Sequence, residues 1–531
     1  MKTAVIGTGP TGLYTFQALL RAGGPRHIAL FEAGSRLGIG LPWSEETTSR
    51  NMLANIASIE IPDLPERYID WLKRQPDDLL TGFGLDRATV DERDFTPRLL
   101  IGNYFADQMQ QLIAIGRAAG VTVEVFEGCR VTDITREAPG YSLQTDQAGQ
   151  LTGFDHVVLA TGHHFERDDD LTDHYFPNPW SGLVSVPVPA ARVGIMGSSL
   201  SAIDAAMVVA VQHGGFSRRD GRLIWQPKAA DGLMLTLMSW TGVLPEADFY
   251  CPIPWEPLEI LTEAAVAEAA AAPDPFNRLW DLFSRQLQAA DPEWSARTGL
   301  ADLTPEGFTQ AYFRPREEGD TFAHARRNLA EAERNREARH TIPWRYAILR
   351  MHEPLEKAVP AFSKAETTRF NATLKTVFTD NYAAVPPLSI ERVLALYDAG
   401  VLEILALGED YQLTHHDGHS EVLAKGKTHR FDVFIDACGQ RPQTSKDLPF
   451  PSLALALQKA GQDAPELSDS FALQGVPGYE GIFFGALPFL MEDQPFVQGL
   501  TSCARNGATI AGAIIRDAEA LSPRSRPAST R

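Results

Sequence analysis

The sequence predicts an α/β fold made of two interleaved Rossmann-like units, with a helical insertion in the second unit. A strand, a glycine turn and a helix follow one another over residues 3–22, and the same order returns from residue 192. Runs around residues 120–162 are matched by similar runs around 400–439, whereas a charged, alanine-rich stretch between about 245 and 345 has no counterpart. One structural plan is therefore used twice and extended once by helices.

The first turn has the pattern of a dinucleotide-binding site. An apolar strand over residues 3–6 leads into GTGPTG at residues 7–12, and helical spacing follows over residues 13–22. Gly7 permits the tight turn, and Gly9 lets the backbone approach a pyrophosphate that the amides of the helix N-terminus bind. An ordinary glycine turn is the alternative interpretation.

The residues after this turn supply the other parts of such a site. Gly12 lets the helix pack close to the strand, and a second strand over residues 27–31 ends in Glu32, twenty positions after Gly12. A carboxylate at that position accepts hydrogen bonds from ribose hydroxyls. The candidate cofactor-binding residues of this segment are Gly7, Gly9, Pro10, Thr11, Gly12 and Glu32.

A glycine-rich loop over residues 33–43 and a polar segment over residues 49–56 come next. Arg50, Asn51 and Asn55 either present polar groups to a cofactor ring or stabilise a surface loop. We include Asn51 and Leu53 among the cofactor-binding candidates.

The first half continues with helices expected over residues 68–73 and 96–116. Strands are expected over residues 121–126, 131–134, 141–145 and 154–160. The last strand runs into Thr161 and Gly162, which lie at the carboxyl edge of the sheet, where such folds bind ligands. His163 and His164 follow, with a packing or capping role as the alternative to ligand binding.

The second turn follows a proline-rich linker at residues 177–189. A strand over residues 192–196 leads into GSSLSAID, in which Ser199 and Ala202 replace the second and third glycines, so a plain strand-to-helix turn stays open as an alternative. The candidate nucleotide-binding residues are Gly197, Ser198, Ser199, Leu200 and Ser201.

The next strand, over residues 222–226, indicates which nucleotide this turn binds. It ends near Lys228 rather than in an acid, which favours a 2′-phosphate and hence NADPH over NADH. A surface lysine without a ligand is the alternative.

The insertion and the end of the chain complete the expected domains. Trp280, Arg285 and Arg314 in the insertion are candidates for substrate contact or, alternatively, ordinary packing and surface residues. Gly439 follows a strand over residues 431–438. Gly499, Leu500 and Thr501 start a final helix. The positive end of this helix faces an electron-rich cofactor ring or, alternatively, the helix is an ordinary C-terminal helix that packs against the domain. We expect a first domain over 1–185 and 430–520, a second over 186–429 with the insertion at about 245–345, and a disordered tail over 521–531.

Composition excludes several classes of function. Lysine and arginine number 48 against 68 acidic residues, and the net charge of −20 disfavours nucleic acid as a partner. No apolar run approaches eighteen residues and no signal-peptide pattern opens the chain, so we expect a cytoplasmic protein without a membrane span. The four cysteines are far apart and form no CxxC, and the histidines at 415–419 flank an expected Asp-Gly hairpin turn, so no metal site and no redox disulfide are expected. A homo-oligomer is left open.

These residues together resemble the two-dinucleotide-binding-domain flavoproteins, and in particular the FAD/NAD(P)-binding group related to flavin-dependent N-hydroxylating monooxygenases. The resemblance covers nearly the whole chain and rests on GTGPTG (7–12), RNMLANIASIEIP (50–62), LATGHH (159–164), GSSLSAID (197–204) and DACGQRP (436–442). It implies that the first turn binds FAD, that the second binds NADPH, and that the start of the last helix approaches the flavin. Asn381 and Tyr382 resemble the Asn-Tyr pair that N-hydroxylases place near nicotinamide and substrate amine, although their surroundings differ, so Asn381 is the catalytic candidate.

The activity implied by this resemblance is NADPH-dependent oxygenation through a C4a-hydroperoxyflavin. The partners would then be molecular oxygen and a small amine or amino acid of secondary metabolism, hydroxylated on nitrogen. Oxygenation of a carbon or carbonyl, as in Baeyer–Villiger enzymes, is one alternative. A non-oxygenating FAD/NAD(P)H oxidoreductase or electron-transfer protein is another, because the second turn departs from the glycine pattern.

Overall fold

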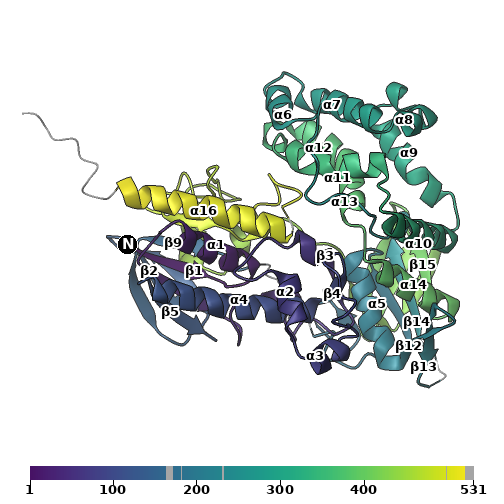
Figure 1. Ribbon diagram of the computed structural model, residues 1–531, viewed down its shortest axis with the longest axis horizontal. Helices are drawn as coiled ribbons and strands as arrows, with labels where there is room; N and C mark the ends of the chain where they lie inside the picture. The colour runs from purple at the N-terminus through teal and green to yellow at the C-terminus, as the bar shows by residue number, and fades with distance from the viewer. Residues whose placement is uncertain (163–170, 181, 230–231, 498, 521–531) are drawn as a thin grey trace, which may run out of the picture.

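The computed structural model describes residues 1–162, 171–180, 182–229, 232–497 and 499–520. The expected tail over 521–531 and the pair His163–His164 lie outside these ranges. Two parallel five-stranded sheets lie side by side, and a layer of helices stands beside the second (Figure 1). The predicted α/β architecture with two Rossmann-like units is confirmed.

The first sheet has the strand order β20-β9-β1-β2-β5, all parallel. All its strands except the edge strand β5 are almost fully buried, because helices pack on one face of the sheet and residues of the segments 131–154 and 448–457 pack on the other. The strands are β1 (Lys2–Ile6), β2 (His27–Glu32), β5 (Thr122–Glu127), β9 (His156–Leu159) and β20 (Ile482–Phe484), and the helices are α1 (Pro10–Arg21), α4 (Arg98–Ala118) and α16 (Leu500–Ala520).

The second sheet repeats this order as β10-β19-β11-β14-β15, again all parallel. Its elements are β10 (Tyr175–Phe176), β11 (Arg192–Met196), α5 (Leu200–His213), β14 (Met234–Ser239), α14 (Pro387–Asp398), β15 (Leu402–Ala406) and β19 (Val433–Asp436). Each unit also carries a three-stranded antiparallel sheet before its fourth strand, formed by β6 (Val131–Arg136), β7 (Tyr141–Thr145) and β8 (Gln150–Phe154), and by β16 (Gln412–His416), β17 (His419–Ala424) and β18 (Lys427–Phe431). The internal repeat expected from the sequence is therefore present strand for strand.

The strand pairing corrects the expected domain boundaries. β10 and β19 both belong to the second sheet, so the second unit includes residues 175–436 rather than 186–429. The inserted helices continue to residue 382 instead of stopping near 345. They are α6 (Glu263–Ala270), α7 (Pro275–Ala290), α8 (Pro292–Thr298), α9 (Pro305–Glu317), α10 (Thr321–Ala338), α11 (Pro343–Glu356), α12 (Lys364–Ala372) and α13 (Leu374–Tyr382).

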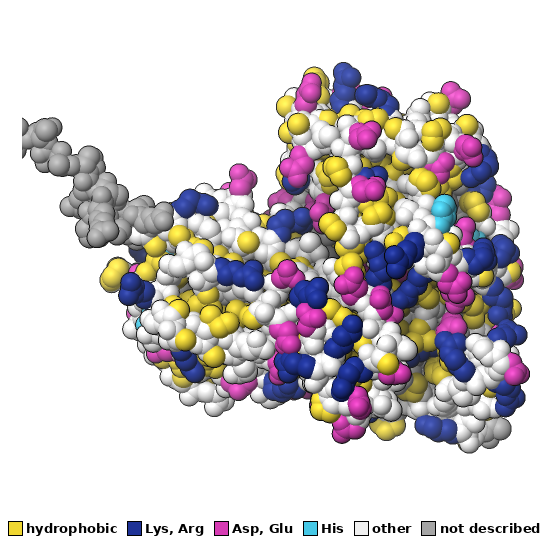
Figure 2. All heavy atoms as spheres, in the orientation of Figure 1, with side chains coloured by type: hydrophobic (Ala, Val, Ile, Leu, Met, Phe, Trp, Pro, Cys, Tyr) yellow, Lys and Arg dark blue, Asp and Glu magenta, His cyan; other side chains and the backbone are white. Residues whose placement is uncertain are grey.

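The helical insertion has its own apolar core, and the segment before α16 belongs to that core. Phe496 packs among insertion residues, with its ring centroid 5.5 Å from Phe378 and 5.8 Å from Tyr382. The backbone N–H of Phe496 also donates a hydrogen bond of 2.5 Å to Glu356 on α11. The insertion is thereby joined to the residues that lead into α16, and the surface is hollowed between α16 and the helical layer (Figure 2).

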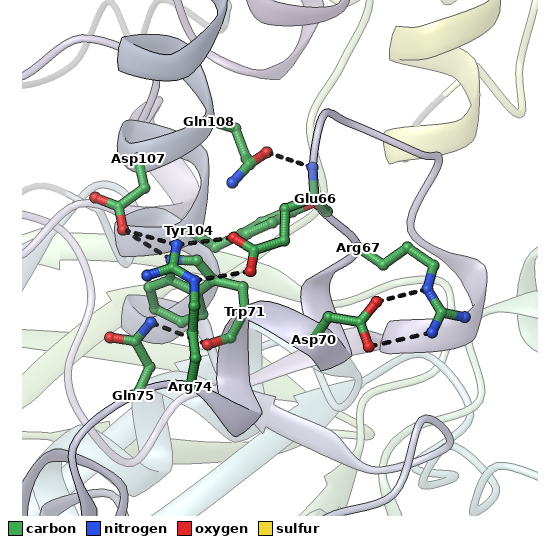
Figure 3. Close-up of polar contacts among 9 residues, drawn as sticks. All are labelled: Glu66, Arg67, Asp70, Trp71, Arg74, Gln75, Tyr104, Asp107 and Gln108. Carbon is green, nitrogen blue, oxygen red and sulfur yellow. Dashed lines mark hydrogen bonds and ion pairs between the residues drawn. The ribbon is translucent and has the colours of Figure 1, made fainter.

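The first unit carries an insertion of its own between β2 and α4. It contains β3 (Leu53–Ala57), α2 (Tyr68–Lys73), α3 (Asp77–Gly82) and β4 (Phe95–Pro97). Arg74 binds both carboxylate oxygens of Glu66 at 2.7 Å, and the indole of Trp71 donates to Asp107 on α4 at 2.8 Å (Figure 3). The Tyr104 hydroxyl donates to the Glu66 carbonyl at 2.6 Å, so α2 and the loop before it are held against α4.

Helices α1 and α16 pack closely because glycine stands at their contact. A Cβ added to Gly507 would lie 2.7 Å from the backbone nitrogen of Thr15. Thr11 contacts Cys503 and Thr15 contacts Gly507, so the contacts advance in the same direction along both helices. The two helices are therefore parallel, with their N-termini on the same side.

This contact predicts an effect of Gly507→Ala. The new methyl group has no room against α1, so we expect the free energy of unfolding to fall by about 1–3 kcal/mol, although alanine is the better helix former. Gly512→Ala in the same helix is the matched control, because only the flexible end of Arg516 lies near its Cβ position, at 3.5 Å. Chemical denaturation of both variants measures the difference, and equal stability would contradict the packing described here.

Candidate FAD and nucleotide sites

The first glycine turn is closed against the end of strand β9. Gly7 has φ of +89°, and a Cβ there would lie 2.3 Å from the carbonyl oxygen of Ala160. A Cβ on Gly12 would lie 2.1 Å from the carbonyl oxygen of Gly7. Gly9 precedes the first residue of α1, which starts at Pro10 rather than at the expected residue 13. The turn is thus a bare backbone surface at a helix N-terminus, which fits a pyrophosphate.

Glu32 completes this turn from the end of β2. One of its oxygens accepts hydrogen bonds from the Thr8 hydroxyl at 2.6 Å and the Thr8 N–H at 3.1 Å. The other accepts from the Gly34 N–H at 2.8 Å. The carboxylate is fixed beside the turn, where the sequence places a ribose-binding acid.

The remaining candidates of the first unit lie around the same edge of the sheet. Thr161 follows β9, and its Cα is 3.1 Å from the position of a Cβ on Gly7. Gly162 is the next residue and is exposed. Leu500 is the first residue of α16, and Thr11 on α1 donates to Cys503 of α16 at 3.3 Å. The structure therefore brings the first turn, the β9 end and the start of α16 together.

The second turn has the same geometry as the first. A Cβ on Gly197 would lie 2.9 Å from the carbonyl oxygen of Ala437, just as Gly7 lies against Ala160. α5 begins at Leu200 with Ser199 as the residue before it, and the Ser198 hydroxyl donates to the Val243 carbonyl at 2.8 Å. Gly439 lies two residues after Ala437, beyond the end of β19, and Ser201 is in the first turn of α5.

Lys228 does not lie at this site, and the expectation that it faces a ribose 2′ group is wrong. Its strand, β13 (Arg222–Pro227), pairs antiparallel with β12 (Gly214–Arg219) outside the parallel sheet. Its ammonium group donates to the carbonyls of Val211 and Gln212 at the C-terminal end of α5. The helix is 14 residues long, so the lysine is about 20 Å from the turn. The second strand of this unit is β14.

Two buried contacts fix the two units relative to each other near their sites. Arg98 of α4 binds Asp204 of α5 at 2.6 Å, and Arg392 of α14 donates to the carbonyl of Asn51 at 2.6 Å. Burial raises the pKa of Asp204, and the two guanidinium groups act against that rise. Asn51 and Leu53 thus lie at the junction of the two units, and Leu53 is buried.

Asn381 lies at the end of α13, beside a small cavity of about 80 Å³. Its side chain is 1% exposed, and neither amide atom has a hydrogen-bond partner among the described residues. The preceding residue, Asp380, binds Arg316 at 2.6 Å and Tyr312 at 2.7 Å, which fixes this end of the helix. The cavity is also lined by Glu60 and Asp248, which sequence reasoning missed because neither belongs to a recognisable motif.

The other residues proposed for substrate contact lie elsewhere. Trp280 packs in the insertion core against Phe283 and Phe308, with ring centroids 5.6 Å apart in both pairs. Arg285 and Arg314 are exposed and pair with Asp281 and Glu318 on their own helices. None of the three lines the small cavity.

One group of described side chains has the spacing of metal ligands, and it lies on an antiparallel hairpin. All four cysteines are free thiols. The expected hairpin at residues 411–424 is present as β16 and β17, and His416, His419 and Glu421 lie within 4.8 Å of one another on it. The two imidazoles lie 3.7 and 3.4 Å from Glu421, so side-chain pairing on an exposed hairpin accounts for the group.

Fold and site together define a flavoprotein with two dinucleotide-binding units. Residues 4–164 match the family model described as FAD-NAD(P)-binding, and residues 262–382 match the YdhS-like middle domain. The chain is 45% identical over 522 residues to the uncharacterized protein YdhS of Escherichia coli K12, covering 97% of this chain and 98% of the relative. It belongs to the YdhS family. The family boundaries agree with the helical insertion found in the structure.

Solved structures of similar fold include a cadaverine monooxygenase and an ornithine hydroxylase. The FAD-bound cadaverine monooxygenase of desferrioxamine biosynthesis from Erwinia amylovora superposes with a TM-score of 0.51 at 12% identity, covering 100% of this chain and 99% of that one. The reduced ornithine hydroxylase of Pseudomonas aeruginosa gives 0.51 at 14% identity, covering 97% and 98%. These likenesses confirm the predicted resemblance in fold. Among the described residues, no helix has the length and apolar character needed to cross a membrane.

The geometry of Glu32 predicts that Glu32→Gln weakens FAD binding. An amide at this position replaces one acceptor oxygen by a donor, so contacts to Thr8 or Gly34 are lost together with the charge. We expect the FAD dissociation constant to rise about 10-fold or more. Fluorescence titration of apoprotein with FAD measures it, with Glu45→Gln in the exposed loop as control. Equal affinities of the two variants would show that Glu32 has no part in the site.

Proposed function

We propose that this protein is an FAD-dependent, NADPH-using monooxygenase that hydroxylates the nitrogen of a small amine or amino acid. The observation that carries the proposal is the place of Asn381. Its partnerless amide lies beside a cavity between β3, which follows the FAD-binding turn, and the insertion, which contacts the segment leading into α16. A polar group kept buried without a partner costs stability, which indicates a ligand-binding role.

The protein groups around the first site have separable roles. The bare turn at Gly7–Gly12 and the N-terminus of α1 hold the pyrophosphate, and Glu32 accepts hydrogen bonds from the ribose. The N-terminus of α16, parallel to that of α1, places a positive dipole end where negative charge develops on the ring. Bound FAD supplies the hydride acceptor and the group that activates oxygen.

The second site and the insertion complete the arrangement. The turn at Gly197–Ser201 holds the nicotinamide nucleotide at the N-terminus of α5. The choice of NADPH over NADH now rests on the resemblance of the motifs, because Lys228 lies at the wrong end of α5. The apolar residues around Phe496 and Tyr382 exclude water from the side of the site that the helical insertion forms. Two enzymes of similar fold are named for amine substrates, ornithine and cadaverine, which supports a nitrogen centre as the target.

The direct test of this function is NADPH oxidation by the FAD-loaded protein with a panel of amines that includes ornithine and cadaverine. An oxygenase of this kind oxidises NADPH faster when its substrate amine is present and forms one hydroxylamine for each NADPH consumed. Rapid flavin reduction by NADPH with no response to any amine and release of only hydrogen peroxide would contradict N-hydroxylation.

Asn381→Ala is expected to separate reaction from folding. Loss of the amide removes a contact to substrate, so the yield of hydroxylamine per NADPH falls about 10-fold or more, while the FAD content is unchanged. Removing a partnerless buried amide leaves the unfolding temperature equal or higher. Asn371→Ala on the exposed face of α12 is the control and alters neither quantity. A variant that loses stability but keeps the hydroxylamine yield would show that Asn381 is a structural residue.

A further inference from the structure

The small cavity beside Asn381 is built from both inserted segments. Glu60 and Asn55 come from the insertion of the first unit, and Asp248 and Asn381 come from that of the second. Its volume of about 80 Å³ corresponds to two or three water molecules at about 30 Å³ each. The cavity is therefore large enough for the head group of a small molecule, but not for a whole amino acid.

The two carboxyl groups in this cavity have no counter-ion of their own. Among the described residues, no ion pair involves Glu60 or Asp248, and Glu60 accepts one hydrogen bond, from the Ala57 N–H at 2.9 Å. The nearby guanidinium groups are bound elsewhere: Arg93 to the Cys251 carbonyl at 3.0 Å, Arg336 to Asp94 at 2.7 Å and Arg345 to Glu246 at 3.0 Å. Arg93 also lines the cavity, so the two carboxyl groups share this small space with one guanidinium group, which among the described residues forms an ion pair with neither of them.

Burial raises the pKa values of both carboxyl groups in the cavity. Burial, and then the neighbouring Glu60, raise the pKa of Asp248 to about 7, although Arg345 and Arg336 act in the opposite direction. Burial of its carboxyl group also raises the pKa of Glu60, while the hydrogen bond from Ala57 and the charge of Arg93 act against the rise. Glu60 as a whole is exposed, so it borders solvent as well as the cavity. Burial raises the pKa of the Cys251 thiol to about 12, so that group stays neutral. A bound cation would offset the repulsion between the two carboxylates.

The amide groups give a second and independent indication of a ligand. Asn381 has neither amide atom paired, and the side-chain oxygen of Asn55 is also buried without a partner. Both residues line the cavity. An amide oxygen accepts hydrogen bonds from an ammonium group, as a carboxylate does, so the four side chains form one set of acceptors.

We propose that this cavity binds the ammonium head of a small organic amine, with Glu60 and Asp248 as its counter-charges and Asn55 and Asn381 as further acceptors. As a substrate site, it rests on the proposed function: the bound ammonium gives one proton to the Asp248 carboxylate, and the neutral amine that results has the lone pair needed for oxygenation and lies beside Asn381. The head group enters from a cleft of about 680 Å³ that shares Arg93, Phe95, Asp248 and Phe249 with the cavity. The rest of the amine lies in that cleft, which accommodates chains of different length.

The test is calorimetric titration of the oxidised, FAD-loaded protein with n-propylammonium chloride, without NADPH. Affinity is expected to rise as the pH increases through about 7, because Asp248 must lose its proton to pair with the cation, and protons are released on binding below that pH. Asp248→Asn and Glu60→Gln each weaken binding about 10- to 100-fold, the range of one charge-assisted hydrogen bond. Glu92→Gln, an exposed neighbour of Arg93 outside the cavity, leaves binding unchanged.

Several outcomes overturn the assignment. If 1-propanol binds with the same affinity as propylammonium, the cavity does not select for charge. If Mg²⁺ or K⁺ displaces the amine at low concentration, the cavity is a site for an inorganic cation. The FAD content of Asp248→Asn and Glu60→Gln verifies that both variants are folded. If both then bind the amine with the affinity of the unchanged protein, the ammonium group binds elsewhere. Binding that follows the expected pattern without any amine-dependent NADPH oxidation keeps the site and refutes the oxygenase. Amine-coupled oxidation with unchanged binding in the variants keeps the oxygenase and refutes the site.

Discussion

The structure depends on one contact made twice, in which a glycine without a side chain lies against the end of the neighbouring parallel strand. Gly7 lies against Ala160 and Gly197 against Ala437, at distances that exclude a Cβ. Each contact lets a helix N-terminus open directly at the carboxyl edge of its sheet, where backbone amides and the helix dipole are free to bind an anion. Both proposed nucleotide sites follow from this contact. Ala202 takes part in the second one, with its Cβ 3.2 Å from the position of a Cβ on Gly197, and its single methyl group leaves the contact with Ala437 in place.

Parallel strands also determine where each unit can be extended. A parallel pair needs a long crossover, and a segment added after the second strand of the unit emerges at the same carboxyl edge as the glycine turn. Both units carry their insertions there, after β2 and after β14. The additions therefore meet near the sites, where Asn55 and Glu60 from one face Asp248 and Asn381 from the other.

Much of the fold could be predicted from the sequence because its signals are local. GTGPTG, Glu32 twenty positions after Gly12, and the matched runs ending at Gly162 and Gly439 each lie within one strand-turn-helix unit. Lys228 was assigned wrongly because a strand pattern does not reveal its partner: β13 pairs with β12 and leaves the parallel sheet. The insertion continues beyond residue 345 because α11, α12 and α13 pack into its apolar core, and a local pattern does not reveal which core a helix joins. Glu60 and Asp248 are brought together only by tertiary structure, so no local pattern could reveal their cavity.

The central claim is that the chain activates oxygen at a protected flavin. The most direct measurement is rapid mixing of anaerobically NADPH-reduced protein with oxygenated buffer while the flavin absorbance is followed. We predict a distinct, oxygen-dependent spectral species that persists before the oxidised spectrum returns and that decays faster when a substrate amine is present. Direct return to oxidised flavin with stoichiometric hydrogen peroxide, unaffected by amines, would contradict the account and indicate an oxidase or reductase.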